Sequence, residues 1–313
     1  MVENNNRSMK NYKDFTVFAN AFSTDEACKQ YLCDQKWKDG FICRKCGHTV
    51  SIKGRTWYYR KCQKCRFDES CTAHTLFHKV KFPLNKAFWI VYQLSTLKKG
   101  MSTMEIARQY GIHQETAWFF KRKVQQSMKP DGERLLNEVV EVDEIAIGGM
   151  DEGAPGRSHG SKKLVLVAVE IDLQNESDNP KPFLKRAYAR MINDYSSREI
   201  SLAIERTIDA RSIVITDNWP SYTKAVGDRF HFSQYSEEGK NFILLHWHIF
   251  NIKNWIRGIH HKISPKHAQN YLDEFHYKFN RRNYISSCPF RVLNRIVKHD
   301  WFSYKMAKGE ISR

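Results

Sequence analysis

Two aspartates interrupt apolar segments that otherwise have the pattern of buried strands. Asp143 lies within VVEVDEIAIGG, residues 139–149, and Asp217 lies near the end of RSIVITDNW, residues 211–219. A buried carboxylate is costly unless it is paired or bound to a metal. Two divalent ions held by carboxylates can activate an attacking water or 3′-hydroxyl and stabilise the leaving oxygen of a phosphodiester. The pair therefore predicts Mg²⁺-dependent phosphodiester chemistry, although Asp217 alone has the alternative of capping a helix that begins near Pro220.

Four cysteines form two CxxC pairs near the start of the chain. The segment between the pairs, HTVSIKGRTWYYRK, has the alternating pattern of a β-hairpin around Gly54. Two CxxC turns joined by a hairpin can bring four sulfurs to about 2.3 Å from one Zn²⁺ ion, which leaves no position for water. A redox CxxC is disfavoured because no βαβ pattern surrounds it. We therefore predict a structural zinc ribbon whose ligands are Cys43, Cys46, Cys62 and Cys65.

A helix-turn-helix pattern follows the cysteines. Ser102 or Thr103 begins one predicted helix, Gly111 marks a turn, and a second helix opens near Gln114. In this motif the second helix enters the major groove and offers its N-terminal side chains to base edges. A plain helical hairpin is the alternative. The predicted DNA contacts are Gln114, Glu115 and Thr116 for bases and Lys121, Arg122 and Lys123 for phosphates.

The composition favours a folded protein that binds nucleic acid. Of 313 residues, 41% are apolar, which argues against disorder, and 51 Lys and Arg against 34 Asp and Glu leave a net charge of +17. Such a balance favours polyanions through release of their condensed counterions. The polar start and the lack of an apolar run of about 18 residues predict a cytoplasmic protein.

The second half of the chain has the strand and helix order of an RNase H-like sheet. Predicted strands at 139–149, 162–172 and 184–192 precede a helix capped near Ser196 and a fourth strand at 211–219. In this topology the first and fourth strands pair in parallel, so Asp143 and Asp217 become neighbours despite their separation in sequence. A helical, basic and aromatic segment follows, broken near Gly258 and Pro265.

We therefore expect an α/β protein with an RNase H-like mixed sheet and flanking helices, preceded by a small zinc ribbon and an all-α helix-turn-helix region. The expected boundaries are a flexible tail at 1–14, the zinc ribbon with a preceding helix at 15–78, the helix-turn-helix region at 79–132, the catalytic domain at 133–290, and a C-terminal tail at 291–313.

Several motifs together resemble one family. CRKCG with KCQKC, KGMSTMEIARQYGIHQETAWFFKRKV, VEVDEIAIGG, GRSHGSKK, ITDNWPSY and HHKISPKHAQNYLDEFHYKFNRR resemble insertion-sequence transposases of the DDE superfamily, in the ISXO2-like branch with an N-terminal zinc ribbon. The resemblance implies an enzyme that binds the terminal inverted repeats of its element, cleaves the 3′ ends and joins them to target DNA with Mg²⁺ or Mn²⁺. It also implies a prokaryotic cytoplasmic location. Asp143 and Asp217 match the first two catalytic aspartates, and pairing of two DNA ends implies a homo-oligomer.

The third catalytic position departs from the family pattern. Relatives commonly have a glutamate there, or asparagine in some groups, but residues 244–258 contain no acid. We predict Asn251, which lies 34 residues after Asp217 and offers an amide oxygen to Mg²⁺. His246 stands where an ungapped comparison sets the glutamate, but imidazole is a poor ligand for Mg²⁺. Glu274 is the other rival, with a salt bridge to Lys278 as its structural alternative, and loss of the acid through inactivation of the element is a further reading.

Basic residues near the predicted active site are candidates for phosphate contacts, or else ordinary solvated charges. Two other functional classes also stay open: a DNA-binding regulator without catalysis, and a structure-specific nuclease that cuts DNA but joins no strands. The candidate phosphate contacts are Lys253, Arg257, Arg281 and Arg282.

Overall fold

The computed structural model describes residues 14–132, 134–148, 162–173, 182–235, 237, 240–260 and 263–310. The chain divides into two compact units, residues 1–128 with 283–313, and residues 129–282. The predicted N-terminal tail, apart from Asp14, and residues 156–161 of the GRSHGSKK motif lie outside the described residues. Among the helices that are described, none has the length and apolarity needed to cross a membrane.

The first unit begins with two helices and a small antiparallel sheet. Helix α1 (Phe15–Ala21) and helix α2 (Asp25–Lys36) precede β1 (Ser51–Lys53), β2 (Tyr59–Cys62) and β3 (Asp68–Ser70). Thr24 begins α2 by accepting a hydrogen bond from the Ala27 amide. The predicted hairpin is present, and Gly54 lies at its turn because a side chain there would collide with Tyr59 and Asp68.

Three further helices form the predicted helix-turn-helix region: α3 (Leu84–Thr96), α4 (Thr103–Tyr110) and α5 (Gln114–Met128). The Ser102 hydroxyl caps α4 by accepting from the Glu105 amide at 3.1 Å. Gly111 ends α4 with φ of +60°, a left-handed conformation that favours glycine. The sequence signals at both ends of α4 therefore act as predicted.

The C-terminal segment folds back onto this first unit. It forms the 3₁₀ helix η2 (Arg282–Ser287), α10 (Cys288–Lys298) and α11 (Tyr304–Lys308), and α10 packs against α2, α3 and α5. Phe290, Leu293 and Ile296 are buried, and the Tyr31 hydroxyl donates a hydrogen bond to Asn294 at 2.7 Å. The expectation of a tail at 291–313 is wrong for this segment, because one face of α10 is apolar and completes the core.

The second unit is a five-stranded mixed sheet with helices on both faces. Strand order is β6-β5-β4-β7-β8; β4, β5 and β6 form an antiparallel meander, and β7 and β8 run parallel to β4. This is the predicted RNase H-like topology. The elements are β4 (Val139–Ile147), β5 (Lys163–Asp172), β6 (Phe183–Ile192), α6 (Ser197–Glu205), β7 (Ile213–Asp217), α7 (Pro220–Ala225), β8 (Phe230–Gln234), η1 (Lys240–Phe242), α8 (Ile243–Ile259) and α9 (Pro265–Phe279).

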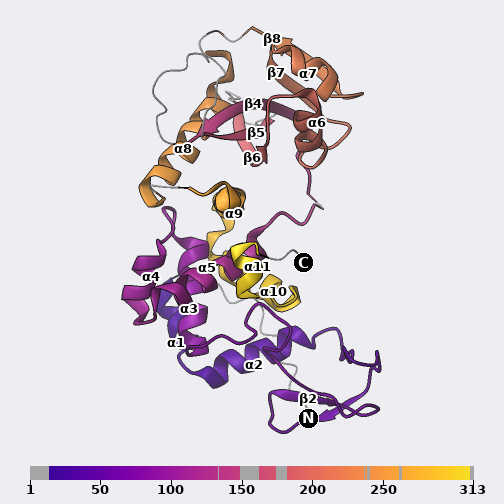
Figure 1. Ribbon diagram of the computed structural model, residues 1–313, viewed down its shortest axis with the longest axis vertical. Helices are drawn as coiled ribbons and strands as arrows, with labels where there is room; N and C mark the ends of the chain where they lie inside the picture. Colours follow the sequence, from indigo (N-terminus) through magenta and orange to yellow (C-terminus); the bar gives the residue numbers. More distant parts are fainter. Residues whose placement is uncertain are drawn as a thin grey trace. The chain divides into compact units, whose positions relative to one another are not determined.

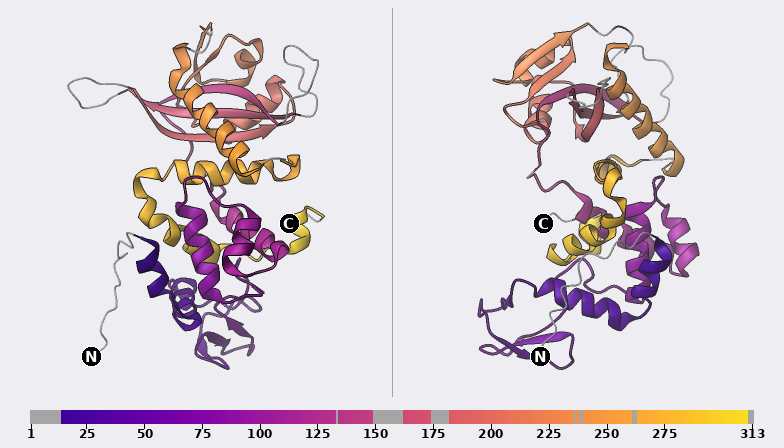
Figure 2. Two further views of the ribbon diagram at one scale, coloured as in Figure 1. Left: turned by 90° about the vertical axis from the view of Figure 1, so that its left-hand side faces the viewer. Right: turned by 180° about the vertical axis from the view of Figure 1, so that it is seen from behind.

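Alternation along the strands divides the core of this unit into two layers. Ile145 and Val167 face α8 and α9, whereas Val142 and Leu166 face α6 and α7. Helix α8 crosses one face of the sheet, with α6 and α7 on the other (Figures 1 and 2). Strand β5 is buried on both faces, which accounts for its nearly continuous apolar sequence.

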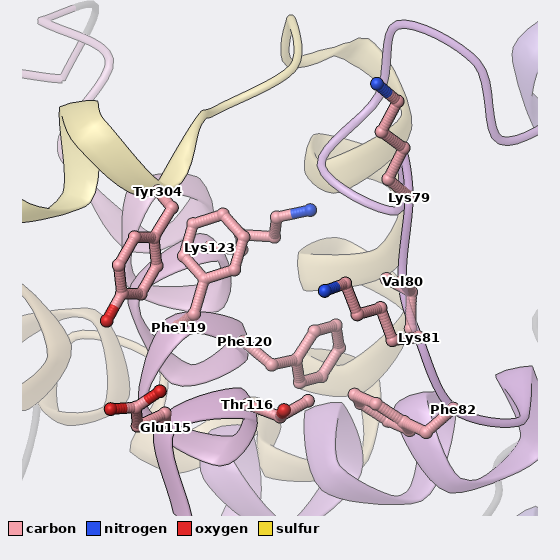
Figure 3. Close-up of a pocket in the computed structure, with 10 residues that line it drawn as sticks. All are labelled: Lys79, Val80, Lys81, Phe82, Glu115, Thr116, Phe119, Phe120, Lys123 and Tyr304. Atoms are coloured by element: carbon pink, nitrogen blue, oxygen red, sulfur yellow. The ribbon is translucent and has the colours of Figure 1, made fainter. Parts of the chain in front are cut away.

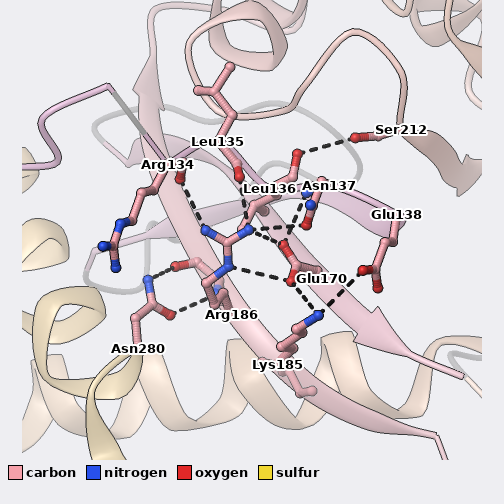
Figure 4. Close-up of polar contacts among 12 residues, drawn as sticks. Arg134, Leu135, Leu136, Asn137, Glu138, Glu170, Lys185, Arg186, Ser212 and Asn280 are labelled. Atoms are coloured by element: carbon pink, nitrogen blue, oxygen red, sulfur yellow. Dashed lines mark hydrogen bonds and ion pairs between the residues drawn. The ribbon is translucent and has the colours of Figure 1, made fainter. Parts of the chain in front are cut away.

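A buried ion pair fixes the segment that enters β4. Glu170 on β5 is fully buried and pairs with Arg186 on β6, and its carboxylate accepts the Asn137 amide at 3.0 Å (Figure 4). Arg186 also donates to the Leu135 carbonyl at 2.9 Å. Because these bonds attach residues 135–137 to the sheet, they help to set where β4 begins.

We expect Arg186→Met to lower the free energy of unfolding by about 3 kcal/mol, since it leaves the Glu170 carboxylate buried beside fewer donors. Arg198→Met on α6 is the matched control, because Arg198 is exposed. Urea unfolding followed by circular dichroism measures both. Equal stabilities of the two variants would contradict the structural role of the pair.

Candidate active site and zinc site

Parallel pairing of β4 and β7 brings the two predicted aspartates together. Glu141 pairs with Ile215 and Val142 with Thr216, so the next residues in register are Asp143 and Asp217. Ile145 and Ile215 both pack on the α8 side of the sheet, and side chains two apart on a strand share a face. Asp143 and Asp217 therefore lie at one level on one face.

Both carboxylates line one small cavity. The cavity measures about 90 Å³ and is bounded by Val142, Asp143, Asp217, Phe242, Leu245 and His246. The Asp143 Oδ1 accepts the Glu144 amide at 2.8 Å, and the Asp217 Oδ1 accepts the Trp219 amide at 3.2 Å. These backbone bonds orient the two carboxylates at the cavity. Two carboxylates that line one small cavity fit the oxygen ligands that Mg²⁺ prefers.

The buried phenol of Tyr222 on α7 lies in the electrostatic field of Asp143, Asp217 and the neighbouring Glu144. Burial raises the pKa of Tyr222 well above its ordinary value, and the charges of Glu144, Asp143 and Asp217 raise it further. Three carboxylates thus act on one side chain. Repulsion between neighbouring carboxylates is relieved when a divalent cation binds to them.

Helix α8 brings His246, and not Asn251, to the aspartates. The His246 Nε2 lies 3.7 Å from the Asp143 Oδ2, and His246 lines the cavity. Asn251 is exposed and does not line it. Five residues along an α-helix turn the side chain by about 140°, which directs Asn251 to another face. The prediction that Asn251 joins the two aspartates is therefore wrong in this structure.

Glu274, the other rival, is fully buried on α9 and pairs with Lys278 at 3.2 Å. The structure therefore contains the Glu274–Lys278 salt bridge that the sequence offered as the structural alternative to a catalytic role. Glu274 does not line the cavity of Asp143.

The four predicted phosphate contacts separate into two groups. Lys253 follows His246 by two helical turns on the same side of α8, and Arg257 is exposed one turn further on. Arg281 donates to the Tyr277 carbonyl, and Arg282 donates to the carbonyls of Leu184 and Lys185 on β6. Because β6 is two strands from β4, the expectation that Arg281 and Arg282 lie near Asp143 is wrong.

Sequence reasoning missed Glu141. It lies two residues before Asp143 on β4. Because side chains two apart on a strand point to the same face, the sequence could have shown that Glu141 shares the face of Asp143. Its side chain is 9% exposed, and burial raises its pKa to about 7, against a hydrogen bond from the Leu245 amide that lowers it. Glu141 thus places a third carboxyl group on the face of β4 that carries Asp143.

The basic cluster predicted to bind phosphates is buried inside the first unit. Lys121 donates to the Met101 carbonyl at 2.6 Å, Arg122 to the Gln125 side chain at 2.8 Å and Lys123 to the His78 carbonyl at 2.7 Å. All three are at most 3% exposed. The prediction of phosphate contacts is wrong for them, because α10 and the segment before α3 cover this half of α5.

The candidate base contacts at the start of α5, unlike the buried basic cluster, are accessible to solvent. Gln114 and Glu115 are exposed, and Thr116 is partly exposed. The Gln114 amide donates to the Thr103 hydroxyl at 3.1 Å, which ties the first turns of α4 and α5 together. The N-terminal turn of α5 is therefore open, as the motif requires.

The four cysteines of the zinc ribbon converge. Their sulfurs all lie within 4.8 Å of one another, with Cys43 and Cys65 at 3.5 Å and Cys46 and Cys62 at 3.6 Å. A tetrahedron with Zn–S bonds of about 2.3 Å has sulfurs about 3.8 Å apart. Desolvation acts to raise the pKa of the Cys62 thiol, but hydrogen bonds from the Cys65 amide and from Cys46 outweigh it and lower that pKa to about 7. The cluster therefore fits a structural Zn²⁺ ion.

Two family profiles match this chain. The ISXO2-like transposase domain matches residues 135–280, and the transposase zinc-ribbon domain matches residues 23–67. Together they span well over half of the sequence and cover both sites described above. The chain belongs to the ISXO2-like transposases. The zinc-ribbon match corresponds to the four convergent cysteines, and the transposase-domain match spans both aspartates and α8.

No curated protein matches the chain. Among solved structures, the crystal structure of the Mos1 strand transfer complex is similar at 14% sequence identity, covering 68% of this chain and 79% of that chain, with a TM-score of 0.21.

We expect this ISXO2-like transposase to carry about one zinc per chain and Cys46→Ser to lose most of it, because a tetrahedral site with three thiolates binds more weakly. Cys46 is exposed, so its replacement removes little packing. Cys33→Ser, outside the cluster, is the control and should keep its zinc. Inductively coupled plasma mass spectrometry measures the content; wild-type protein purified without zinc and folded normally would contradict the site.

Proposed function

We propose that this chain is a DNA transposase that binds terminal inverted repeats, cleaves the 3′ ends of its element and joins them to target DNA. The observation that carries the proposal is the meeting of Asp143 and Asp217 at one cavity in an RNase H-like sheet. Membership of a transposase family supports the same chemistry.

Asp143 and Asp217 would hold Mg²⁺ or Mn²⁺, which supplies Lewis acidity at the scissile phosphate and at the attacking oxygen. The backbone bonds from Glu144 and Trp219 hold the two carboxylates in place before DNA arrives. Such preorganisation means that the site need not rearrange as charge develops on the phosphate.

His246 is our candidate for the third active-site position. Its imidazole faces the cavity beside Asp143, within reach of a water or hydroxyl bound there. We propose that it accepts the proton of the attacking oxygen, a role that suits imidazole better than Mg²⁺ ligation does. Lys253, on the same side of α8, would contact a phosphate near the site.

The open first turn of α5, with Gln114, Glu115 and Thr116, is our candidate for contacts to the terminal repeats. Pairing two ends of an element usually calls for at least two protomers. We therefore propose that the chain acts as a homo-oligomer on DNA.

We expect Asp143→Asn and Asp217→Asn each to lower strand transfer by about 1,000-fold, or about 4 kcal/mol of activation free energy, since each removes a charge that holds the metal. The assay follows joining of labelled terminal-repeat DNA to a plasmid in Mg²⁺. Circular dichroism controls for folding.

Either of the other functional classes would give a different result in that assay. Cleavage by the wild type without any joined product would favour a nuclease. DNA binding without cleavage, unchanged in both variants, would favour a regulator.

We expect His246→Ala to lower cleavage by about 100-fold, the lower end of general acid–base contributions. Asn251→Ala is the matched control on the same helix and should leave cleavage within about twofold, because Asn251 faces away from the cavity. Single-turnover cleavage of terminal-repeat DNA measures both. A larger loss of cleavage in Asn251→Ala than in His246→Ala would instead favour Asn251 as the third catalytic residue.

A further inference from the structure

A second cavity lies in the first unit, beside the start of α5. It measures about 360 Å³ and lies between residues 79–82, α5 and the beginning of α11 (Figure 3). Its size is in the range of pockets that bind small organic groups. Neither the zinc ribbon nor the helix-turn-helix contacts proposed above account for it.

Four aromatic rings form part of the wall. Phe119 lies edge-on to Tyr304 with ring centres 5.4 Å apart, and Phe82 lies edge-on to Phe120 at 5.2 Å. Tyr304 is 37% exposed, so its ring is reachable from solvent. Faces of this kind stack on nucleobases, whose π-systems are stabilised by about 1–3 kcal/mol per base in such contacts.

Two lysines line the cavity beside these rings, and the ammonium of one of them, Lys123, donates to the His78 carbonyl at 2.7 Å. The other lysine is Lys81 (Figure 3), which is exposed. Lys123 is 3% exposed, with its ammonium 4.8 Å from the centre of the Phe119 ring, and burial lowers its pKa to about 8. Within the described parts of the chain, neither lysine forms an ion pair. The cavity thus offers positive charge with no matched carboxylate on either cation.

The cavity also borders the proposed DNA-reading turn. Glu115 and Thr116, in the first turn of α5, form part of its lining. A DNA strand that follows α5 would therefore pass its opening, with phosphates available to Lys81.

We propose that this cavity binds one unpaired nucleotide of the DNA held by α5, with its base against the aromatic rings and its phosphate at Lys81. The proposal rests on DNA binding by the helix-turn-helix region. Aromatic walls favour a base over bare duplex backbone, which offers only phosphate and sugar to the protein. The adjacent cations favour a nucleotide over an uncharged aromatic ligand.

The test is fluorescence anisotropy with full-length protein and labelled terminal-repeat duplexes, without divalent metal, so that cleavage plays no part. One duplex set carries a single unpaired nucleotide at successive positions; a second set has an abasic site in its place. The variants are Lys81→Ala and Tyr304→Leu. Lys305→Ala is the matched control, because Lys305 is exposed on α11 next to Tyr304 and does not line the cavity.

At one position of the unpaired nucleotide, we expect the wild type to bind about tenfold tighter to the base-containing duplex than to its abasic counterpart. Tyr304→Leu should abolish that difference, and Lys81→Ala should reduce the slope of log affinity against log salt by about 0.7–0.9. Lys305→Ala should change neither quantity.

The proposal is overturned if the abasic duplexes bind as tightly as the others at every position, or if Tyr304→Leu retains the preference for the base. A reduced salt slope in Lys81→Ala without any base dependence would mean that the opening binds duplex backbone only, and would also overturn it. No binding to any terminal-repeat DNA would instead refute the proposed function itself.

Discussion

The parallel pairing of β4 with β7 is the constraint on which the proposed chemistry depends. Side chains alternate between the faces of a sheet, so a slip of one residue in either strand would send one aspartate to the opposite layer. Several bonds hold this register. The Ile213 amide donates to the Glu138 carbonyl at 2.8 Å, and the Glu170–Arg186 pair fixes the residues just before β4. An ion pair remote from the cavity thus helps to define the cavity.

Helix α8 also determines the composition of the candidate active site, because its rotation about its own axis sets which of its side chains lies beside the aspartates. Its apolar face, with Leu245, Ile249 and Ile252, packs on the sheet and fixes that rotation. His246 then lies beside Asp143, while Asn251 turns outward. Two oxygens on β-strands and one imidazole on a helix are therefore brought together by packing of the apolar residues that flank them.

The basic side chains of the first unit fall into two groups: some are buried and form hydrogen bonds inside the unit, and others are exposed. Lys121, Arg122 and Lys123 lie next to one another in sequence, yet their donors satisfy backbone carbonyls or a glutamine inside the unit. Lys81 has no such internal partner among the described residues and extends into an aromatic cavity. A net charge of +17 thus indicates affinity for polyanions without indicating which cations meet them.

The sequence alone determined the features that depend on local spacing: the CxxC pairs, the caps of α4, the strand and helix order of the second unit, and the convergence of Asp143 with Asp217 that this order requires. Tertiary structure alone decided which face of α8 meets the sheet, that Arg282 donates hydrogen bonds to β6, and that α10 covers α3 and α5. The physical reason is that spacing and turn chemistry act between near neighbours. Burial of a side chain instead depends on elements that arrive from distant parts of the chain.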